Sequence, residues 1–104
     1  MAKTYDYNGE RIWFQKGAYA DNGTLALLAM CAEGPYAHFT VNLADPALPG
    51  CAFVDTNNLG NGVCSFLMDN GIASPTGREQ RSGFCTFPEY MFDPDFLDDC
   101  DEIA

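Results

Sequence analysis

Positive charge is scarce in this chain. Of its 104 residues, 5 are lysine or arginine and 15 are aspartate or glutamate, which gives a formal net charge of −10. Binding along a phosphate backbone depends on clustered lysines and arginines. The composition therefore excludes ordinary direct binding of nucleic acid.

Residue types that commonly carry catalysis are scarce as well. The chain has 1 histidine, His38, and histidine is the commonest general base in enzymes that activate a nucleophile. Alternation along the predicted strand places His38 on the more polar face, which favours a surface residue. We therefore predict no enzymatic activity and no catalytic residue. A cysteine-dependent enzyme that pairs His38 with Cys64 or Cys85 is our third hypothesis.

The cysteines lack the spacing of a metal site. There are 5 of them, and the closest pair, Cys51 and Cys64, is 13 residues apart, whereas zinc sites usually pair cysteines about two to four residues apart. The C-terminal acids do not have the spacing of a calcium-binding EF-hand loop either. We expect reduced, buried thiols, no metal and no cofactor. One alternative stays open, a site that the fold assembles from Cys31, Cys51, Cys64, Cys85 and His38.

Long apolar runs are also missing. No run approaches the roughly 18 residues that cross a bilayer, and the first residues contain no apolar core of a secretory signal. The glycine fingerprints of nucleotide-binding loops are absent. Hydrophobic residues nevertheless make up 47% of the chain and aromatic residues 13%, too many for a disordered protein. We expect one folded, cytoplasmic domain that does not bind a membrane.

What the sequence does contain is a series of short strands divided by turns. Alternation from Tyr36 to Leu43 is typical of a half-buried strand, and Asn8-Gly9 predicts a hairpin turn. Further strands are predicted over residues 4–7, 11–14, 24–32, 51–54 and 84–92, with a loop at 45–50 and a turn at 74–77. One helix is predicted from a cap at residue 57 or 58 to about Asn70, and a short one over 95–103. The predicted class is α+β, an antiparallel sheet of about five or six strands with one packed helix and a short acidic C-terminal helix.

Negative charge is concentrated at the C-terminal end. Residues 1–88 contain 8 acids and 5 bases, whereas residues 89–104 contain 7 acids and no base. We divide the chain into a single α+β domain over 1–93 and an acidic segment over 94–104 that packs on it or extends from it. A dense carboxylate surface attracts basic grooves and can imitate phosphates, although a merely solubilising end is the alternative. The predicted partner-binding residues are Asp93, Asp95, Asp98, Asp99, Asp101 and Glu102.

The one basic spot is the segment from residue 77 to residue 83, which contains Arg78 and Arg81. Arginine suits bidentate contacts to phosphate or carboxylate. A nucleotide-binding or nucleotide-sequestering module is therefore our second hypothesis. Its stacking partners, if the fold brings them together, would be Trp13, Tyr36 and Phe84. The alternatives are a mobile surface loop or arginines that pair with the protein's own acidic tail.

Several longer motifs carry a family resemblance. They lie at residues 19–26, 36–43, 52–58, 75–78 and 82–92, and read YADNGTLA, YAHFTVNL, AFVDTNN, PTGR and SGFCTFPEYMF. Over roughly residues 19–93 the chain resembles a small, uncharacterised family of domains of unknown function carried by conjugative elements and phages of gut bacteria. The resemblance implies no activity, cofactor or catalytic residue. It implies a mobile-element setting, in which small acidic proteins often blunt host defence.

Charge and setting together lead to our first hypothesis. It is a non-enzymatic binding protein of a mobile element, acting as an anti-defence inhibitor of the anti-CRISPR or anti-restriction kind. Its acidic surface would mimic nucleic acid and occupy a basic groove of a host protein that handles nucleic acid. The identity of that partner and the oligomeric state, a dimer included, are left open.

Overall fold

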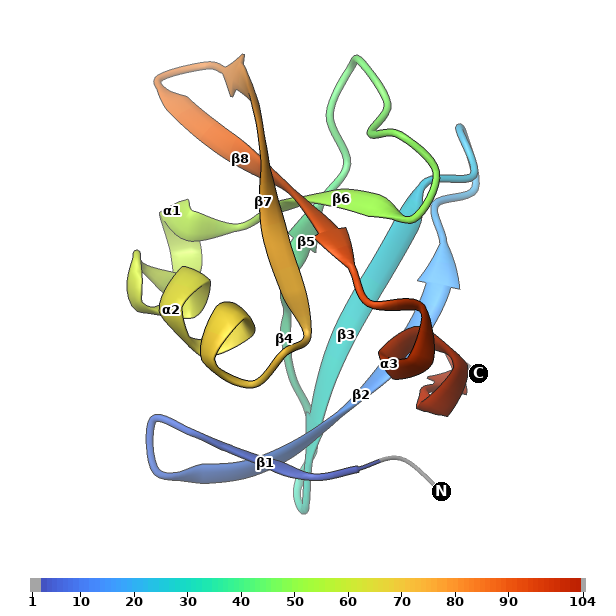
Figure 1. Cartoon of the computed structure of the whole chain (residues 1–104), viewed down its shortest axis with the longest axis vertical. Coiled ribbons are helices and arrows are strands. Elements are labelled where there is room, and N and C mark those ends of the chain that lie inside the picture. Colours follow the sequence, from blue (N-terminus) through green and yellow to red (C-terminus); the bar gives the residue numbers. More distant parts are fainter. Residues whose placement is uncertain (1–2, 104) are drawn as a thin grey trace.

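The strands form two sheets rather than the single predicted one. The computed structural model describes residues 3–103, so the outer ends of the predicted ranges 1–93 and 94–104 lie outside the described residues. The first sheet has the order β1 (Tyr5–Tyr7), β2 (Glu10–Ala18), β3 (Leu25–Cys31) and β4 (Gly34–His38), and β9 (Asp101–Glu102) also pairs with β2. The second has the order β5 (Thr40–Val41), β6 (Cys51–Val54), β8 (Cys85–Phe92) and β7 (Ala73–Ser82) (Figure 1).

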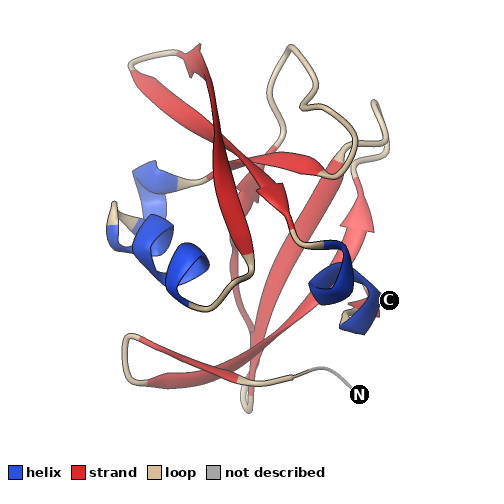
Figure 2. Cartoon of the chain, in the orientation of Figure 1, coloured by secondary structure: helices blue, strands red, loops and turns tan. Residues whose placement is uncertain are grey.

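Three short helices complete the described part of the chain. Helices α1 (Thr56–Leu59) and α2 (Gly62–Asp69) lie together on one side of the molecule, and α3 (Pro94–Asp99) lies on the other (Figures 1 and 2). The strand pairings are antiparallel apart from that of β2 with β9. The predicted α+β class is confirmed. None of the helices within residues 3–103 is long and apolar enough to cross a membrane.

Phe39 marks the point where the chain passes from one sheet to the other. Its N–H donates to the Leu27 carbonyl at 2.9 Å, and its carbonyl accepts from the Asp55 N–H at 3.0 Å. The predicted strand over 36–43 is therefore divided between β4 and β5. Thr40, which would share the more polar face with His38 in one continuous strand, is 2% exposed. Its hydroxyl lies 2.9 Å from the Tyr19 hydroxyl and accepts from the Leu27 N–H at 3.1 Å, so the buried oxygen has partners.

Aromatic side chains from strands and helices form the centre of the core. The rings of Phe14 and Phe39 have centroids 5.1 Å apart, and Phe66 of α2 lies 4.9 Å from Tyr7. Phe96 of α3 lies 5.5 Å from Phe14. These pairs meet edge to face, the arrangement that the ring quadrupole favours. One apolar core thus joins the first sheet to α2 and α3.

The helix predicted from residue 57 or 58 is wrong at its start and in its continuity. Asp55 caps it instead, because its Oδ1 accepts from the Asn58 N–H at 3.2 Å. The helix then breaks at Gly60, whose φ of +81° is a left-handed conformation that suits glycine. Helix α2 does end where predicted, next to Asn70.

The turn predicted over 74–77 is also wrong. These residues lie within β7, where the register shifts between Pro75 and Glu79 and leaves a bulge at 76–78. Pro88 lies within β8, where it stands opposite Glu79. A bulge lets a strand carry extra residues while the pairing resumes beyond it. The two strands therefore form one long hairpin.

The terminal helix predicted over 95–103 is shorter than expected. Helix α3 ends at Asp99, and Cys100 has extended dihedral angles, φ −74° and ψ 138°. The chain then forms β9, in which Asp101 pairs with Gln15 of β2 and Glu102 with Lys16. Strand β1 pairs only with residues 10–12 of β2, so the same edge of β2 is open beyond residue 12. Pairing with β9 satisfies backbone groups of this open edge, which outweighs the helical pattern of the sequence.

Candidate functional site

The six predicted partner-binding acids lie along α3 and β9. Asp93 and Pro94 begin the helix, since the Asp93 carboxylate accepts from the Phe96 N–H at 3.0 Å and Pro94 occupies the first helical turn. Phe96 turns into the core and is 8% exposed. The opposite side of α3 therefore faces solvent. We call the exposed carboxylates of this region the acidic surface, which consists of Asp93, Asp95, Asp98, Asp99, Asp101 and Glu102.

Two of these carboxylates have a structural partner. Asp93 caps α3, and Asp99 accepts from the backbone N–H of Lys3 at 2.8 Å. This second contact joins the two ends of the described chain. Of the acidic surface, the carboxylates that form no hydrogen bond or ion pair within residues 3–103 are those of Asp95, Asp98, Asp101 and Glu102. These four carboxylates are available to a partner.

Cys100 anchors the acidic surface from behind. Its thiol is buried and donates to the Phe96 carbonyl at 3.3 Å. Burial raises the pKa of Cys100 to about 11; the nearby Lys16 ammonium opposes this rise, and the charges of Asp99 and Asp101 add to it. The thiol is therefore neutral at pH 7. It acts as a packed, weakly hydrogen-bonding residue rather than as a nucleophile.

Glu89, which the sequence groups with the C-terminal acids, is not part of this surface. Its side chain is 0% exposed. It accepts from the Thr76 hydroxyl at 2.7 Å and from the Leu48 N–H at 3.2 Å, and Arg78 Nη1 lies 3.6 Å from it. A buried carboxylate needs such partners. Glu89 therefore holds the second sheet together instead of facing a partner protein.

An apolar groove adjoins the acidic surface. It has a volume of about 490 Å³. Met68 and Met91 line it and are 46% and 55% exposed, and methionine adapts readily to irregular apolar partners. Asp93 also lines the groove, so apolar and acidic areas are continuous. No local pattern marks this groove in the sequence, because its walls come from α2, β7, β8 and the start of α3.

The two arginines of the predicted ligand site are engaged within the β7–β8 hairpin. Arg78 lies against the buried Glu89, and the Arg81 Nε donates to the Gly83 carbonyl at 3.2 Å. Neither arginine lines the groove or a second hollow of about 550 Å³ beside the loop at 46–50. Arg78 thus pairs with an acid of the chain, but this acid is the buried Glu89 of β8 and not a carboxylate of the acidic surface.

The predicted stacking aromatics do not meet on one face. Trp13 stands between two buried neighbours of β2 and so points away from the core. Tyr36 packs against the core, with its ring 6.2 Å from that of Tyr7. Phe84 is fully exposed at the tip of the β7–β8 hairpin. The structure thus places the three rings in three different surroundings.

The predicted cysteine–histidine pair is not assembled either. His38 is exposed at the end of β4, opposite Leu28. Cys64 packs against the core from α2, and Cys85 begins β8 in the other sheet. Among the described residues no hydrogen bond joins His38 to a thiol, and the cysteines are all free.

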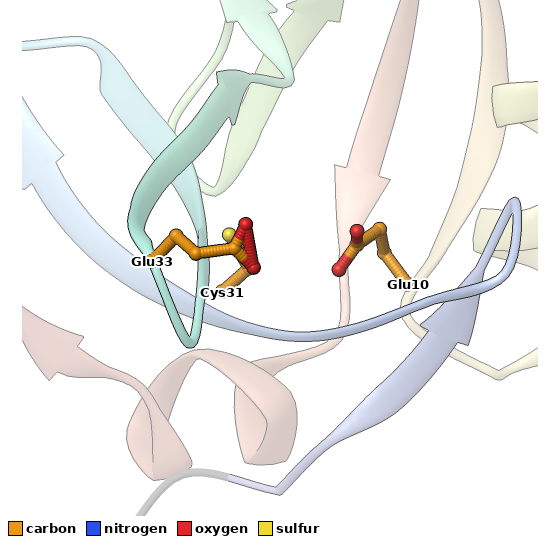
Figure 3. A group of neighbouring side chains, drawn as sticks. All are labelled: Glu10, Cys31 and Glu33. Atoms are coloured by element: carbon orange, nitrogen blue, oxygen red, sulfur yellow. The ribbon is translucent and has the colours of Figure 1, made fainter.

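A different group of metal-ligating side chains does come together. Glu10 begins β2, Cys31 ends β3, and Glu33 lies in the turn after it. Their ligand atoms all lie within 4.8 Å of one another (Figure 3). Of the residues in the predicted scattered site, Cys31 alone takes part. Sequence reasoning missed the two glutamates because they belong to different hairpins.

Comparison with known proteins gives a family and no activity. A family model described as "Domain of unknown function (DUF4313)" matches residues 15–103. No curated protein and no solved structure matches the chain. The predicted resemblance to a domain-of-unknown-function family is confirmed. The match extends beyond the predicted range of 19–93 and includes the acidic surface.

Proposed function

The chain belongs to the DUF4313 family of domains of unknown function, and we propose that it acts as a binding protein rather than as an enzyme. In this proposal the acidic surface and the adjoining groove dock together on a basic host protein that handles nucleic acid. The observation that carries the proposal is the continuity of the two areas. Asp93 both lines the groove and begins the helix that presents the other carboxylates.

The two areas would make different contributions to binding. Exposed carboxylates steer a positively charged partner and set its orientation, but each exposed pair adds little affinity. Apolar side chains such as Met68 and Met91 supply contact area that can be removed from water. A partner that presents an apolar side chain flanked by lysine or arginine fits both areas.

The finer form of the proposal is a cytoplasmic anti-defence inhibitor of a mobile element, of the anti-CRISPR or anti-restriction kind. Carboxylates held on a capped helix and a paired strand have defined spacing, which is what imitation of phosphates requires. Free cysteines are typical of a reducing compartment. The mobile-element setting has its support in the family resemblance of the sequence alone.

The two other hypotheses have less support. A nucleotide-binding module needs Arg78 free to grip an anion, whereas this side chain faces the buried Glu89. A cysteine-dependent enzyme needs a thiol beside His38, which is exposed on β4. Either function would require the side chains to rearrange.

The test compares the binding of the full chain and a charge variant to one purified partner, first captured from a gut-bacterial lysate. The variant removes three carboxylates that have no structural partner, by Asp95→Asn, Asp98→Asn and Asp101→Asn. Each exposed charge pair contributes about 0.2–1 kcal/mol, so the triple variant should bind roughly threefold to a hundredfold more weakly. Its binding should also depend less on salt concentration. A DNA duplex should compete with the wild-type chain if the surface imitates nucleic acid.

A matched control removes three carboxylates elsewhere on the surface, by Asp6→Asn, Asp45→Asn and Glu79→Gln. This control has the same net charge as the first variant and should bind like the wild type. Equal weakening by both variants would show that net charge, and not the acidic surface, drives association. Met91→Ser tests the groove and should weaken binding without changing its salt dependence. Wild-type affinity in the acidic-surface variant would refute the proposal.

A further inference from the structure

We propose that Glu10, Cys31 and Glu33 form a binding site for a thiophilic divalent metal ion such as Zn²⁺. The ligand atoms of the three residues all lie within 4.8 Å of one another. Figure 3 shows the two carboxylates reaching toward one another from different hairpins, with the Cys31 sulfur beside the carboxylate of Glu33. The site lies near the start of β2, whereas β9 pairs with residues 15 and 16 further along that strand. It is therefore separate from the acidic surface.

Two tight turns hold these side chains in place. The turn Asn8–Gly9 has positive φ values of 50° and 82°, and Glu10 follows it as the first residue of β2. In the next hairpin Cys31 pairs with Gly34, which leaves Glu33 in a two-residue turn. Because both turns have defined backbone geometry, the ligands come from rigid elements rather than from a long loop.

Cys31 provides independent support for the site. Its side chain is 8% exposed, and its thiol forms no hydrogen bond within residues 3–103. Buried polar groups usually have a partner. Instead of a donor or acceptor at hydrogen-bond distance, the sulfur has two carboxylates within 4.8 Å. A metal ion between them would supply the missing partner.

The charges of the two glutamates support the same conclusion. The salt bridges in the described part of the chain join Arg11 to Asp6 and Arg78 to Glu89, so neither glutamate of the group has a cationic partner there. Two carboxylates held this close repel each other. A divalent cation bound between the two carboxylates would offset this repulsion, because each carboxylate is attracted to the cation.

The chemistry of the three ligands favours zinc over magnesium or calcium. Thiolate is a soft ligand, whereas magnesium and calcium prefer oxygen ligands alone. Zinc binds sulfur at about 2.3 Å and carboxylate oxygen at about 2.0–2.2 Å, so tetrahedral ligands lie about 3.3–3.7 Å apart. The ligand atoms need to approach by about 1 Å, which rotation of glutamate side chains beside turns can provide. Binding transfers the thiol proton of Cys31 to solvent and leaves about one tetrahedral position for water.

The test is a titration of the chelator-treated, full-length chain with Co²⁺, followed by displacement with Zn²⁺. Cobalt bound to a thiolate gives a charge-transfer band in the near ultraviolet, so the band should appear, saturate at one equivalent and disappear when zinc is added. Cys31→Ser should abolish the band. Glu10→Gln and Glu33→Gln should each weaken cobalt binding at least about tenfold. The matched controls Cys85→Ser and Glu79→Gln should bind cobalt like the wild type.

Three results of the cobalt titration and its displacement would each overturn the proposal, and a fourth comes from the glutamate variants. The first three are the absence of a band in the wild-type chain, a band that survives Cys31→Ser, and displacement of cobalt by excess Mg²⁺. Replacement of a buried cysteine can unfold the chain, so the two glutamate variants give a second test that does not depend on it. Unchanged cobalt affinity in both glutamate variants, with native circular dichroism, would also overturn the proposal.

Discussion

Removal of the buried Glu89 carboxylate tests how the second sheet is held together. This side chain is 0% exposed and contacts two other segments of the chain. It accepts from the Thr76 hydroxyl at 2.7 Å in the β7 bulge and from the Leu48 N–H at 3.2 Å in the preceding loop. Glu89→Ala would leave the Leu48 N–H without its acceptor and would leave the Thr76 hydroxyl with only the backbone carbonyl of residue 89, at 3.4 Å. It would also leave Arg78 without the carboxylate 3.6 Å away.

The size of the effect follows from these contacts. A buried donor that loses its acceptor costs about 1–3 kcal/mol of unfolding free energy. The Arg78 side chain is 49% exposed, so water can solvate it and its ion pair adds little. Leu48 is 50% exposed, so the loss of the acceptor of its N–H should cost an amount at the lower end of the range for buried donors. We therefore expect Glu89→Ala to cost about 2–4 kcal/mol and Glu89→Gln, which keeps one acceptor oxygen, about 1–2 kcal/mol.

Urea unfolding followed by Trp13 fluorescence and by circular dichroism measures these differences. Glu79→Ala is the matched control, because Glu79 is an exposed glutamate on the neighbouring strand, opposite Pro88. Its unfolding free energy should stay within about 0.5 kcal/mol of the wild type. A loss below about 1 kcal/mol for Glu89→Ala, or equal losses at the two glutamates, would refute the reasoning.

Three further perturbations test the C-terminal end. Asp93→Ala removes the cap of α3 and should cost about 1 kcal/mol, whereas Asp95→Ala should cost almost nothing; equal effects in thermal melts would contradict the capping role. Burial raises the pKa of Cys100 from 9.0 to about 11, so its thiol stays neutral in the folded chain after it ionises in the unfolded one. The contribution of this pKa shift to the free energy of unfolding is full below about pH 9 and falls by up to about 2.7 kcal/mol as pH rises to about 11. If the free energy of unfolding of Cys100→Ala fell with pH as steeply as that of the wild type, the result would argue against this role. Gly17→Ala would place a Cβ 3.1 Å from Ile103 Cδ1 and should cost about 1 kcal/mol, most of which Ile103→Ala should remove in a double-mutant cycle.

Local patterns in the sequence were sufficient for elements whose signal comes from neighbouring residues. The Asn8–Gly9 turn predicts the first hairpin correctly because positive φ values suit these two residues. The apolar run over 24–32 predicts β3, and the loop at 45–50 is also correct. Local patterns could not show that the strand over 36–43 changes sheets at Phe39. That change depends on backbone hydrogen bonds to Leu27 and Asp55, which are distant in sequence.

The same distinction applies to the acidic surface. The distribution of acids and bases along the sequence located the six carboxylates of the acidic surface at the C-terminal end, because a run of acids without bases is visible in the sequence itself. The cap formed by Asp93 and the short α3 also have local causes, namely the capping aspartate and the proline after it. The strand β9 does not, since it forms on the open edge of β2 and satisfies backbone groups of both strands.

Sequence alone therefore determined the class of the fold, the turn at Asn8–Gly9, the loop at 45–50 and the end of the chain that carries the charge, because each depends on residues that are neighbours along the chain. Tertiary structure decided which acids are exposed to water and which residues they contact. It buried Glu89, which accepts a hydrogen bond from Thr76, and it placed Met68 and Met91 in the wall of one groove. It also brought Cys31 close to two glutamates of separate hairpins. The physical reason is that solvent exposure and side-chain proximity follow from strand pairing and packing, which join residues that are far apart in the sequence.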